Sequence, residues 1–230
     1  MNQRFEGFFN RIANGYEKHI SFLPGYRQTI SHIDKLIGAS DVLVDVGTGT
    51  GSLSFKMASK TTKIIAVDIS DRMLKMAKKR ASKYNTRNIE FKKAEIRNIP
   101  VNDSSADIIV SNLTLHHLKN KEKLVAVQEF YRILKPNGKL IVGDLMKTAK
   151  GSLEFIKKLF QNYKKVYGYL NACCLLIKMI IEKLFLNREY PMAPLKWIKI
   201  LEEVGFELTN IKNIDSMLWV SSAVKTNHDN

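Results

Sequence analysis

Short runs of apolar residues alternate with amphipathic stretches through the middle of the chain, from residue 42 to residue 146. Each apolar run has the length of a buried strand, and the stretches between the runs repeat apolar residues at helical spacing. The expected strands are 42–44, 63–67, 89–93, 107–111 and 139–142, and the expected helices are 52–59, 70–84 and 122–134. This alternation predicts a parallel sheet with helices on both faces.

Helices are expected on both sides of this alternating core. The pattern predicts them at 5–20, 26–37, twice within 151–186, and at 194–204. The chain then closes with two strands, 206–214 and 217–224, whose hairpin brings an antiparallel strand to the sheet. We therefore expect an α/β fold: a doubly wound sheet of seven strands, the last antiparallel, with N-terminal helices and a helical lid inserted near 151–190.

The length of 230 residues fits one large domain, since domains usually hold about 100–200 residues. We expect the whole chain, 1–230, to form this one domain. Its parts are a helical cover (1–41), the alternating core (42–146), the helical lid (147–193), a C-terminal helix and hairpin (194–225) and a disordered tail (226–230).

Basic residues outnumber acidic ones by 37 to 22, which gives a net charge of +15. Residues 147–188 hold nine basic and two acidic residues and are the most densely basic stretch. A basic surface attracts nucleic acid, anionic lipid or an acidic substrate. However, 28 of the 37 basic residues are lysine, and scattered lysines usually form a solvated face. Charge alone therefore leaves the partner open.

The expected lid has an amphipathic pattern, with Phe155, Leu159 and Tyr163 at helical spacing and lysines elsewhere. Such a helix can lie on a lipid surface or simply cover a core. The only cysteines, Cys173 and Cys174, are interpreted as helical core residues, and they cannot frame a secreted fold. With no apolar signal segment at the start of the chain, a cytoplasmic protein is expected, with peripheral membrane contact as a further possibility.

The stretch from Val42 to Gly51 carries the clearest sign of ligand binding, because a buried strand runs into closely spaced glycines and then a helix. Glycines let the backbone turn tightly and approach a ligand closely. The glycines stand at 47, 49 and 51, so the spacing departs from the nicotinamide pattern Gly-x-Gly-x-x-Gly. Asp45 before the loop suits a cationic ligand better than a pyrophosphate.

This loop resembles that of class I S-adenosylmethionine-dependent methyltransferases, and the resemblance runs densely over 42–145 and loosely over 195–225. The family pattern acid-x-Gly-x-Gly-x-Gly is matched by Asp45, Gly47, Gly49 and Gly51. Later segments also match, among them 107–113, 115–118 and 131–140. The resemblance implies a Rossmann-like fold, S-adenosylmethionine as the methyl donor, S-adenosylhomocysteine as the product, and no metal.

The resemblance also implies a role for each donor-site residue. The loop with Asp45 and Thr48 would hold the amino acid end of the donor. Asp68, with Ile69 beside it, would hold the ribose hydroxyls, the device that dinucleotide enzymes use at this place. Glu95 and Ile96 would contact the adenine. The end of the fourth strand would face the methyl group, at Asn112 and Leu113.

The N-terminal segment from Phe8 to Tyr16 resembles the opening helix of the ubiquinone and menaquinone C-methyltransferases, whose tyrosine lines the active site. The alternative is a helix that packs its aromatic side chains on the core. The chain departs from that branch at His116-His117, where the branch has Arg-Asn. We expect His116 to act as a general base, because a histidine pKa lies near working pH. His117 and Tyr16 are the other catalytic candidates. Adjacent residues do not face the same site, so one of the two histidines would instead pack at the helix start.

The sequence predicts methyl transfer to a small, apolar acceptor, quinone-like or of another kind. Two alternatives stay open: a methyltransferase acting on RNA or protein, and a non-catalytic donor-binding protein. The segment Ser111–Thr114 lacks the Pro-Pro that follows Asn or Asp in enzymes that methylate adenine amines or glutamine amides. Expected partners are the small acceptor and, by peripheral contact, an anionic membrane, with nucleic acid less favoured. The chain is expected as a monomer or homodimer.

Overall fold

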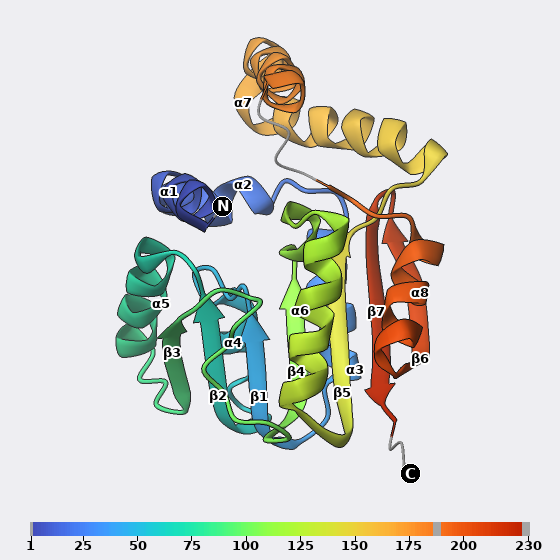
Figure 1. Cartoon of the computed structure of the whole chain (residues 1–230). Helices are drawn as coiled ribbons and strands as arrows, with labels where there is room; N and C mark the ends of the chain where they lie inside the picture. The colour runs from blue at the N-terminus through green and yellow to red at the C-terminus, as the bar shows by residue number, and fades with distance from the viewer. Residues whose placement is uncertain (1, 186–189, 227–230) are drawn as a thin grey trace.

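The computed structural model describes residues 2–185 and 190–226 and contains one sheet of seven strands (Figure 1). Their spatial order is β3-β2-β1-β4-β5-β7-β6. The strands are β1 (Ser40–Val46), β2 (Thr61–Asp68), β3 (Ile89–Lys93), β4 (Ala106–Asn112), β5 (Leu134–Leu145), β6 (Phe206–Asp215) and β7 (Leu218–Lys225). β1 to β5 pair in parallel, and β7 pairs antiparallel with both β5 and β6. The expected doubly wound sheet with an antiparallel last strand is therefore confirmed.

Helices cover both faces of the sheet. The helices are α1 (Asn2–Ile12), α2 (Tyr16–Ile20), α3 (Tyr26–Leu36), α4 (Ser52–Met57), α5 (Asp71–Lys83), α6 (Asn120–Ile133), α7 (Ala149–Phe185) and α8 (Pro194–Val204), with short 3₁₀ turns η1 (Ala13–Gly15) and η2 (Leu115–His117). Side chains of α6 and α8 share one apolar cluster with Val44 and Val46 of β1. Leu43 points the other way and packs with α3 and α4. Successive residues of a strand thus pack into two apolar cores, one on each face of the sheet, as the two-residue period of a strand requires.

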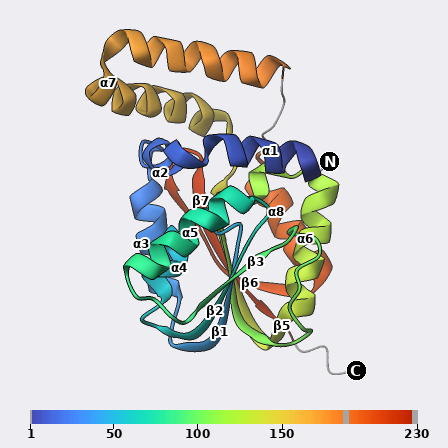
Figure 2. The ribbon, with the colours of Figure 1, turned by 90° about the vertical axis from the view of Figure 1, so that its left-hand side faces the viewer.

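The lid forms the two helices that the sequence predicts, although they run on in one element, α7. Gly168, with φ 81° and ψ 172°, breaks α7 into two arms (Figure 2). The left-handed φ at this position is one that glycine adopts without steric cost. No helix within residues 2–185 and 190–226 combines the length and apolarity that crossing a bilayer demands.

The first arm of α7 is attached to the end of the sheet. Phe155 and Leu159 are buried in a small cluster with Leu113 at the end of β4, next to Phe22 of the N-terminal segment. The side chain of Asn162 donates a 3.0 Å hydrogen bond to the carbonyl of Phe22. Lid, N-terminal segment and β4 therefore meet at one place.

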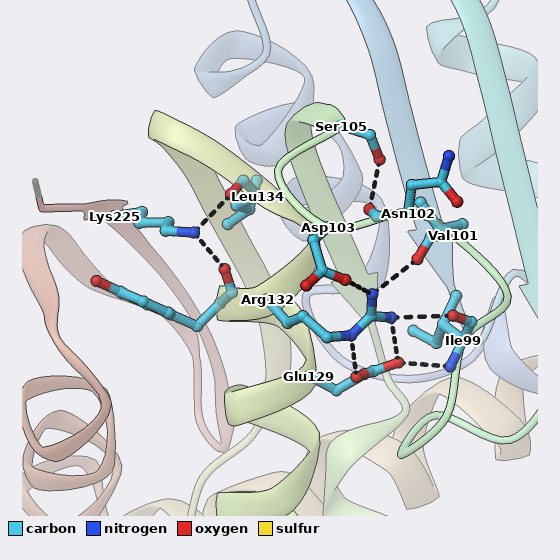
Figure 3. Close-up of polar contacts among 10 residues, drawn as sticks. Ile99, Val101, Asn102, Asp103, Ser105, Glu129, Arg132, Leu134 and Lys225 are labelled. Carbon is cyan, nitrogen blue, oxygen red and sulfur yellow. Dashed lines mark hydrogen bonds and ion pairs between the residues drawn. The ribbon is translucent and has the colours of Figure 1, made fainter.

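The loop between β3 and β4 is fixed by Arg132 of α6 (Figure 3). Its guanidinium donates to the carbonyls of Ile99 and Val101 and pairs with Asp103. Glu129 pairs with Arg132 and accepts a 2.6 Å hydrogen bond from the backbone N–H of Ile99. The ion pair holds the pKa of the Glu129 carboxyl below its usual value. This network anchors the loop a few residues after the predicted adenine contacts.

Some boundaries differ from expectation. The helix expected over 5–20 is interrupted by η1, where Gly15 ends the turn before α2. The cysteine interpretation is wrong for Cys174, which is exposed, while Cys173 is half-buried. Of the expected tail, Thr226 donates from its hydroxyl to the carbonyl of Gly205 at 2.8 Å, and residues 227–230 lie outside the described chain.

Candidate active site

Two adjoining cavities lie where β1, β2 and β4 end. The larger has a volume of about 800 Å³ and the smaller about 390 Å³, in both cases including space that is open to solvent. The larger cavity includes these predicted residues: Tyr16, Gly47, Gly49, Asp68, Ile69, Glu95, Ile96, Leu113 and His117. The smaller shares four of them and adds Asp45, Thr48 and Asn112. Residues predicted from separate motifs are thus brought to one place.

The glycine loop follows β1 directly. The backbone N–H groups of Gly47 and Thr48 both donate to the carbonyl of Val67, at 2.8 and 2.9 Å, which ties the loop to β2. Gly47 has a φ of 75°, and a Cβ added there would meet the side chain of Thr114, with Cγ2 at 2.5 Å. Gly51 lines neither cavity, because it caps α4 at a φ of 83° beside the ring of Phe55. Its role in this structure is the turn into α4.

Asp45 is 1% exposed and lies beside the start of α4. Its carboxylate accepts hydrogen bonds from the hydroxyls of Thr48 at 2.8 Å and Ser54 at 2.5 Å. Burial raises the pKa of Asp45, and the two hydroxyls oppose that rise. Nearby, the Oδ1 atom of Asn112 is buried without a hydrogen-bond partner among the described residues. A ligand that donates hydrogen bonds, such as an ammonium group, suits these oxygens.

Asp68 ends β2 and joins the glycine loop to α5. One carboxylate oxygen accepts from the backbone N–H of Gly49 and the other from that of Ser70, both at 2.8 Å. Burial raises the pKa of Asp68 from 3.8 to about 6, and these backbone donors counteract it. Asp68 is therefore a partly buried acceptor on the cavity wall, the type of group that binds neighbouring hydroxyls.

The histidines are placed differently from expectation. His116 is 5% exposed and lines neither cavity; its Nδ1 lies 2.5 Å from the carboxylate of Asp144, which also accepts from the His116 backbone N–H. His117 lines the larger cavity, with its ring edge-on to Phe9 at 5.1 Å. The buried carboxylate of Asp144, near the end of β5, needs hydrogen-bond donors, and it therefore holds the ring of His116 in the protein interior. The turn η2 then directs His117 to the larger cavity. The prediction that His116 rather than His117 faces the acceptor does not agree with this arrangement.

Tyr16 lines both cavities, and its ring lies 3.5 Å from where a Cβ on Gly49 would be. Burial raises the pKa of Tyr16 well above its ordinary value, and the charge of Asp68 adds to this. The next residue, Glu17, secures the segment by accepting hydrogen bonds from the hydroxyls of Thr50 and Ser52 at 2.7 and 2.8 Å, and by pairing with Arg80 of α5. These contacts fix the N-terminal segment over the loop.

Comparison with known proteins agrees with this arrangement. Residues 37–205 match the family model described as Methyltransferase domain. The chain belongs to this family. It is an S-adenosylmethionine-dependent methyltransferase, and its family implies S-adenosylmethionine as the donor.

The methyltransferase has relatives with different acceptors in their names. It is 29% identical over 219 residues to the ubiquinone/menaquinone biosynthesis C-methyltransferase of Marinomonas sp., covering 90% of this chain and 84% of that protein. It is also 29% identical over 112 residues to an arsenite methyltransferase of Halobacterium salinarum, but that match covers 47% of this chain and 28% of the relative. A SAM-dependent methyltransferase structure from Aquifex aeolicus shares the fold, with a TM-score of 0.60, 21% identity, and coverage of 86% and 89% of the two chains.

Three polar residues that line the larger cavity of the methyltransferase were not predicted: Arg97, Thr114 and Glu122. Arg97 pairs with Glu95 and lies 3.4 Å from the carboxylate of Glu122, which caps α6 by accepting from the backbone N–H of Lys119. Arg97 and Thr114 directly follow predicted residues in the sequence, and this adjacency could have indicated them. Glu122 could not be found this way, because it reaches the cavity only through the packing of α6.

No cluster of three or more His, Cys, Asp or Glu side chains suited to a metal occurs among residues 2–185 and 190–226. The expectation that the enzyme holds no metal stays a prediction.

Proposed function

We propose that the enzyme transfers the methyl group of S-adenosylmethionine to a small, apolar acceptor that binds beside Phe9 and His117. The observation that carries this proposal is the two-part character of the cavity. Its loop side presents the carboxylates of Asp45 and Asp68, and its other side presents aromatic and aliphatic groups such as Phe9 and Leu118. A charged, hydroxyl-bearing donor suits the first side and an apolar acceptor the second.

In this proposal the donor-site residues keep the roles that the family resemblance implies, except Asn112, which is assigned to the ammonium group of the donor instead of the methyl group. Asp45 and Asn112 accept hydrogen bonds from the ammonium group of the donor, and Asp68 accepts them from the ribose hydroxyls. Ile96 packs on the adenine beside Glu95. The fit is supported by the buried Oδ1 of Asn112, which has no hydrogen-bond partner among the residues that the structure describes.

The sulfonium of the donor, when bound, supplies an electrophilic methyl group for in-line displacement. The protein's own part is to align the acceptor with that carbon and exclude water, which can contribute about 7–11 kcal/mol. Tyr16 and Phe9 line the cavity, and so does Leu113, which directly follows the last residue of β4. An acceptor that must lose a proton would give it to the imidazole of His117, a step that typically contributes about 10²–10⁴-fold in rate.

The similarity to the Marinomonas enzyme, named for ubiquinone and menaquinone biosynthesis, supports a quinone-like ring as one form of this acceptor. The test is to incubate the enzyme with cell extract and donor carrying an isotope-labelled methyl group. Mass spectrometry should find the label in small lipid-extractable molecules. Label found only in RNA or protein would overturn the acceptor class and support the alternative that the basic surface suggested.

A further inference from the structure

The lid exposes an unusual share of the apolar surface. Nine large hydrophobic side chains in the described part of the chain are exposed, and six of them belong to α7. These are Leu153, Ile156, Val166, Tyr169, Leu170 and Ile177. Isolated exposed apolar residues are ordinary on a protein surface, but a concentration of them on one element usually marks an interaction site.

The exposed residues concentrate around the break in α7. Val166 and Tyr169, on either side of Gly168, are 57% and 60% exposed, and Leu170 is 80% exposed. Leu170, Cys174 and Ile177 are all exposed and stand at the i, i+4, i+7 spacing that aligns side chains along one helix face. We call the segment from Val166 to Leu170 the tip.

The tip is bordered by positive charge. Lys157, Lys164 and Lys165 are exposed, and none of them takes part in an ion pair between residues that the structure describes. The ammonium group of Lys164 lies 5.4 Å from the centre of the Tyr169 ring. Lys158, by contrast, is occupied by Glu154 and Asp215. Unpaired lysines beside an exposed tyrosine and leucine match what an interfacial helix offers to lipid: apolar groups for the acyl boundary and cations for the headgroups.

We propose that the tip of α7 docks on the surface of an anionic lipid membrane. Figures 1 and 2 show the two arms of α7 beyond the end of the sheet where α1 and α2 also lie. Docking there turns the end of the molecule that carries the candidate active site toward the membrane. The proposal rests on the surface of α7 and does not require the proposed methyl acceptor to be correct.

The experiment is flotation of the full chain with vesicles of phosphatidylcholine, with and without phosphatidylserine, at low and high salt. The chain should float with the anionic vesicles, and salt should reduce this by screening the lysines. The double variant K164Q/K165Q should bind roughly 30-fold more weakly, from about 1 kcal/mol for each lysine. V166S/L170S should lose roughly tenfold or more, because it removes the apolar groups that enter the lipid.

Two matched controls test whether removing lysines or an exposed apolar residue elsewhere on the surface has the same effect. K78Q/K79Q removes two neighbouring exposed lysines from α5, and L195S removes a leucine of α8 that is 76% exposed. Both should float like the unchanged chain. All variants should keep the affinity for S-adenosylhomocysteine, which shows that they are folded.

Equal flotation with neutral and anionic vesicles, or equal losses in the control variants, would overturn the proposal. So would self-association in sedimentation velocity that L170S abolishes without any vesicle binding, since the tip would then be an interface between copies. Salt-sensitive binding of a single-stranded RNA that K164Q/K165Q removes, with vesicles left unbound, would assign the surface to nucleic acid instead.

Discussion

The carboxylate of Asp68 accepts a 2.8 Å hydrogen bond from the backbone N–H of Gly49, so the acid that ends β2 is joined to the loop that follows β1. The two residues come from separate sequence motifs and meet at adjacent parallel strands. Because both line the larger cavity, a ligand that binds Asp68 must also lie against the loop. In the proposed donor site, the acid and the loop are therefore held together by the protein's own hydrogen bond.

Product binding should depend on pH through Asp68. Burial raises its pKa to about 6, so the free protein holds a neutral carboxyl below that pH and a carboxylate above it. Ribose hydroxyls bind the carboxylate better, and the affinity for S-adenosylhomocysteine should rise as the pH increases through about 6. Calorimetric titrations on both sides of this pH should show the step. D68N should remove it and weaken donor and product alike by about 1–3 kcal/mol.

The raised pKa of Asp68 has the opposite effect on stability: product affinity rises with pH, but the free energy of unfolding falls. The folded chain keeps the Asp68 proton between pH 3.8 and about 6, where the unfolded chain has lost it. The contribution of Asp68 to the free energy of unfolding therefore falls as the pH rises through this window.

The binding prediction has its own contradicting outcome. If the unchanged chain binds S-adenosylhomocysteine equally well at all these pH values, Asp68 does not have the assigned role.

Gly47→Ala should disrupt the glycine loop. The new Cβ would meet Thr114 at a φ of 75°, so we expect a loss of about 1–3 kcal/mol in the free energy of unfolding, with weaker donor binding. Gly7→Ala is the control: a Cβ there has no atom within 4 Å, and alanine in a helix should gain about 0.5–1 kcal/mol. Urea unfolding measures both. Adding Thr114→Ala to Gly47→Ala should recover part of the loss, and no recovery would place the strain elsewhere.

Substitution of one histidine should affect turnover, and substitution of the other should affect stability. His117→Ala should lower turnover by about 10²–10⁴-fold where the acceptor must lose a proton, with little change in donor affinity. His116→Ala should instead destabilise the fold by about 1–3 kcal/mol, because the buried Asp144 carboxylate loses its hydrogen bond to the imidazole. Turnover and thermal unfolding of both variants decide this. Full turnover in His117→Ala would mean that the acceptor needs no base or finds one other than His117.

Glu17 should control how firmly the N-terminal segment closes the site. Glu17→Ala removes the acceptor for Thr50, Ser52 and Arg80, and we expect product to dissociate roughly fivefold faster, about 1 kcal/mol for a half-exposed cluster. Glu6→Ala is the control, since it removes a surface pair with Lys93. Stopped-flow dissociation of S-adenosylhomocysteine measures both. An unchanged dissociation rate in Glu17→Ala, compared with the unsubstituted chain, would show that the Glu17 contacts do not hold the segment closed.

Much of the fold could be predicted because each strand and helix is determined by residues that lie close together in the sequence. Asp45 and Asp68 lie at the ends of apolar runs, so their convergence follows from parallel strands ending at one edge. The roles of His116 and His117 could not be assigned from adjacency, since Asp144, 28 residues later in the chain, decides which ring turns inward. Gly51 was expected with the other loop glycines, but the ring of Phe55 packs beside it.

A crystal structure of the chain with S-adenosylhomocysteine tests the central claim, that this cavity is the donor site, most directly. The account predicts both ribose hydroxyls within hydrogen-bonding distance of the Asp68 carboxylate, the ammonium group beside Asp45 and Asn112, and the adenine against Ile96. The sulfur should then face the side of the cavity that holds Phe9 and His117. A product molecule bound elsewhere, or one whose ribose does not contact Asp68, would contradict the account.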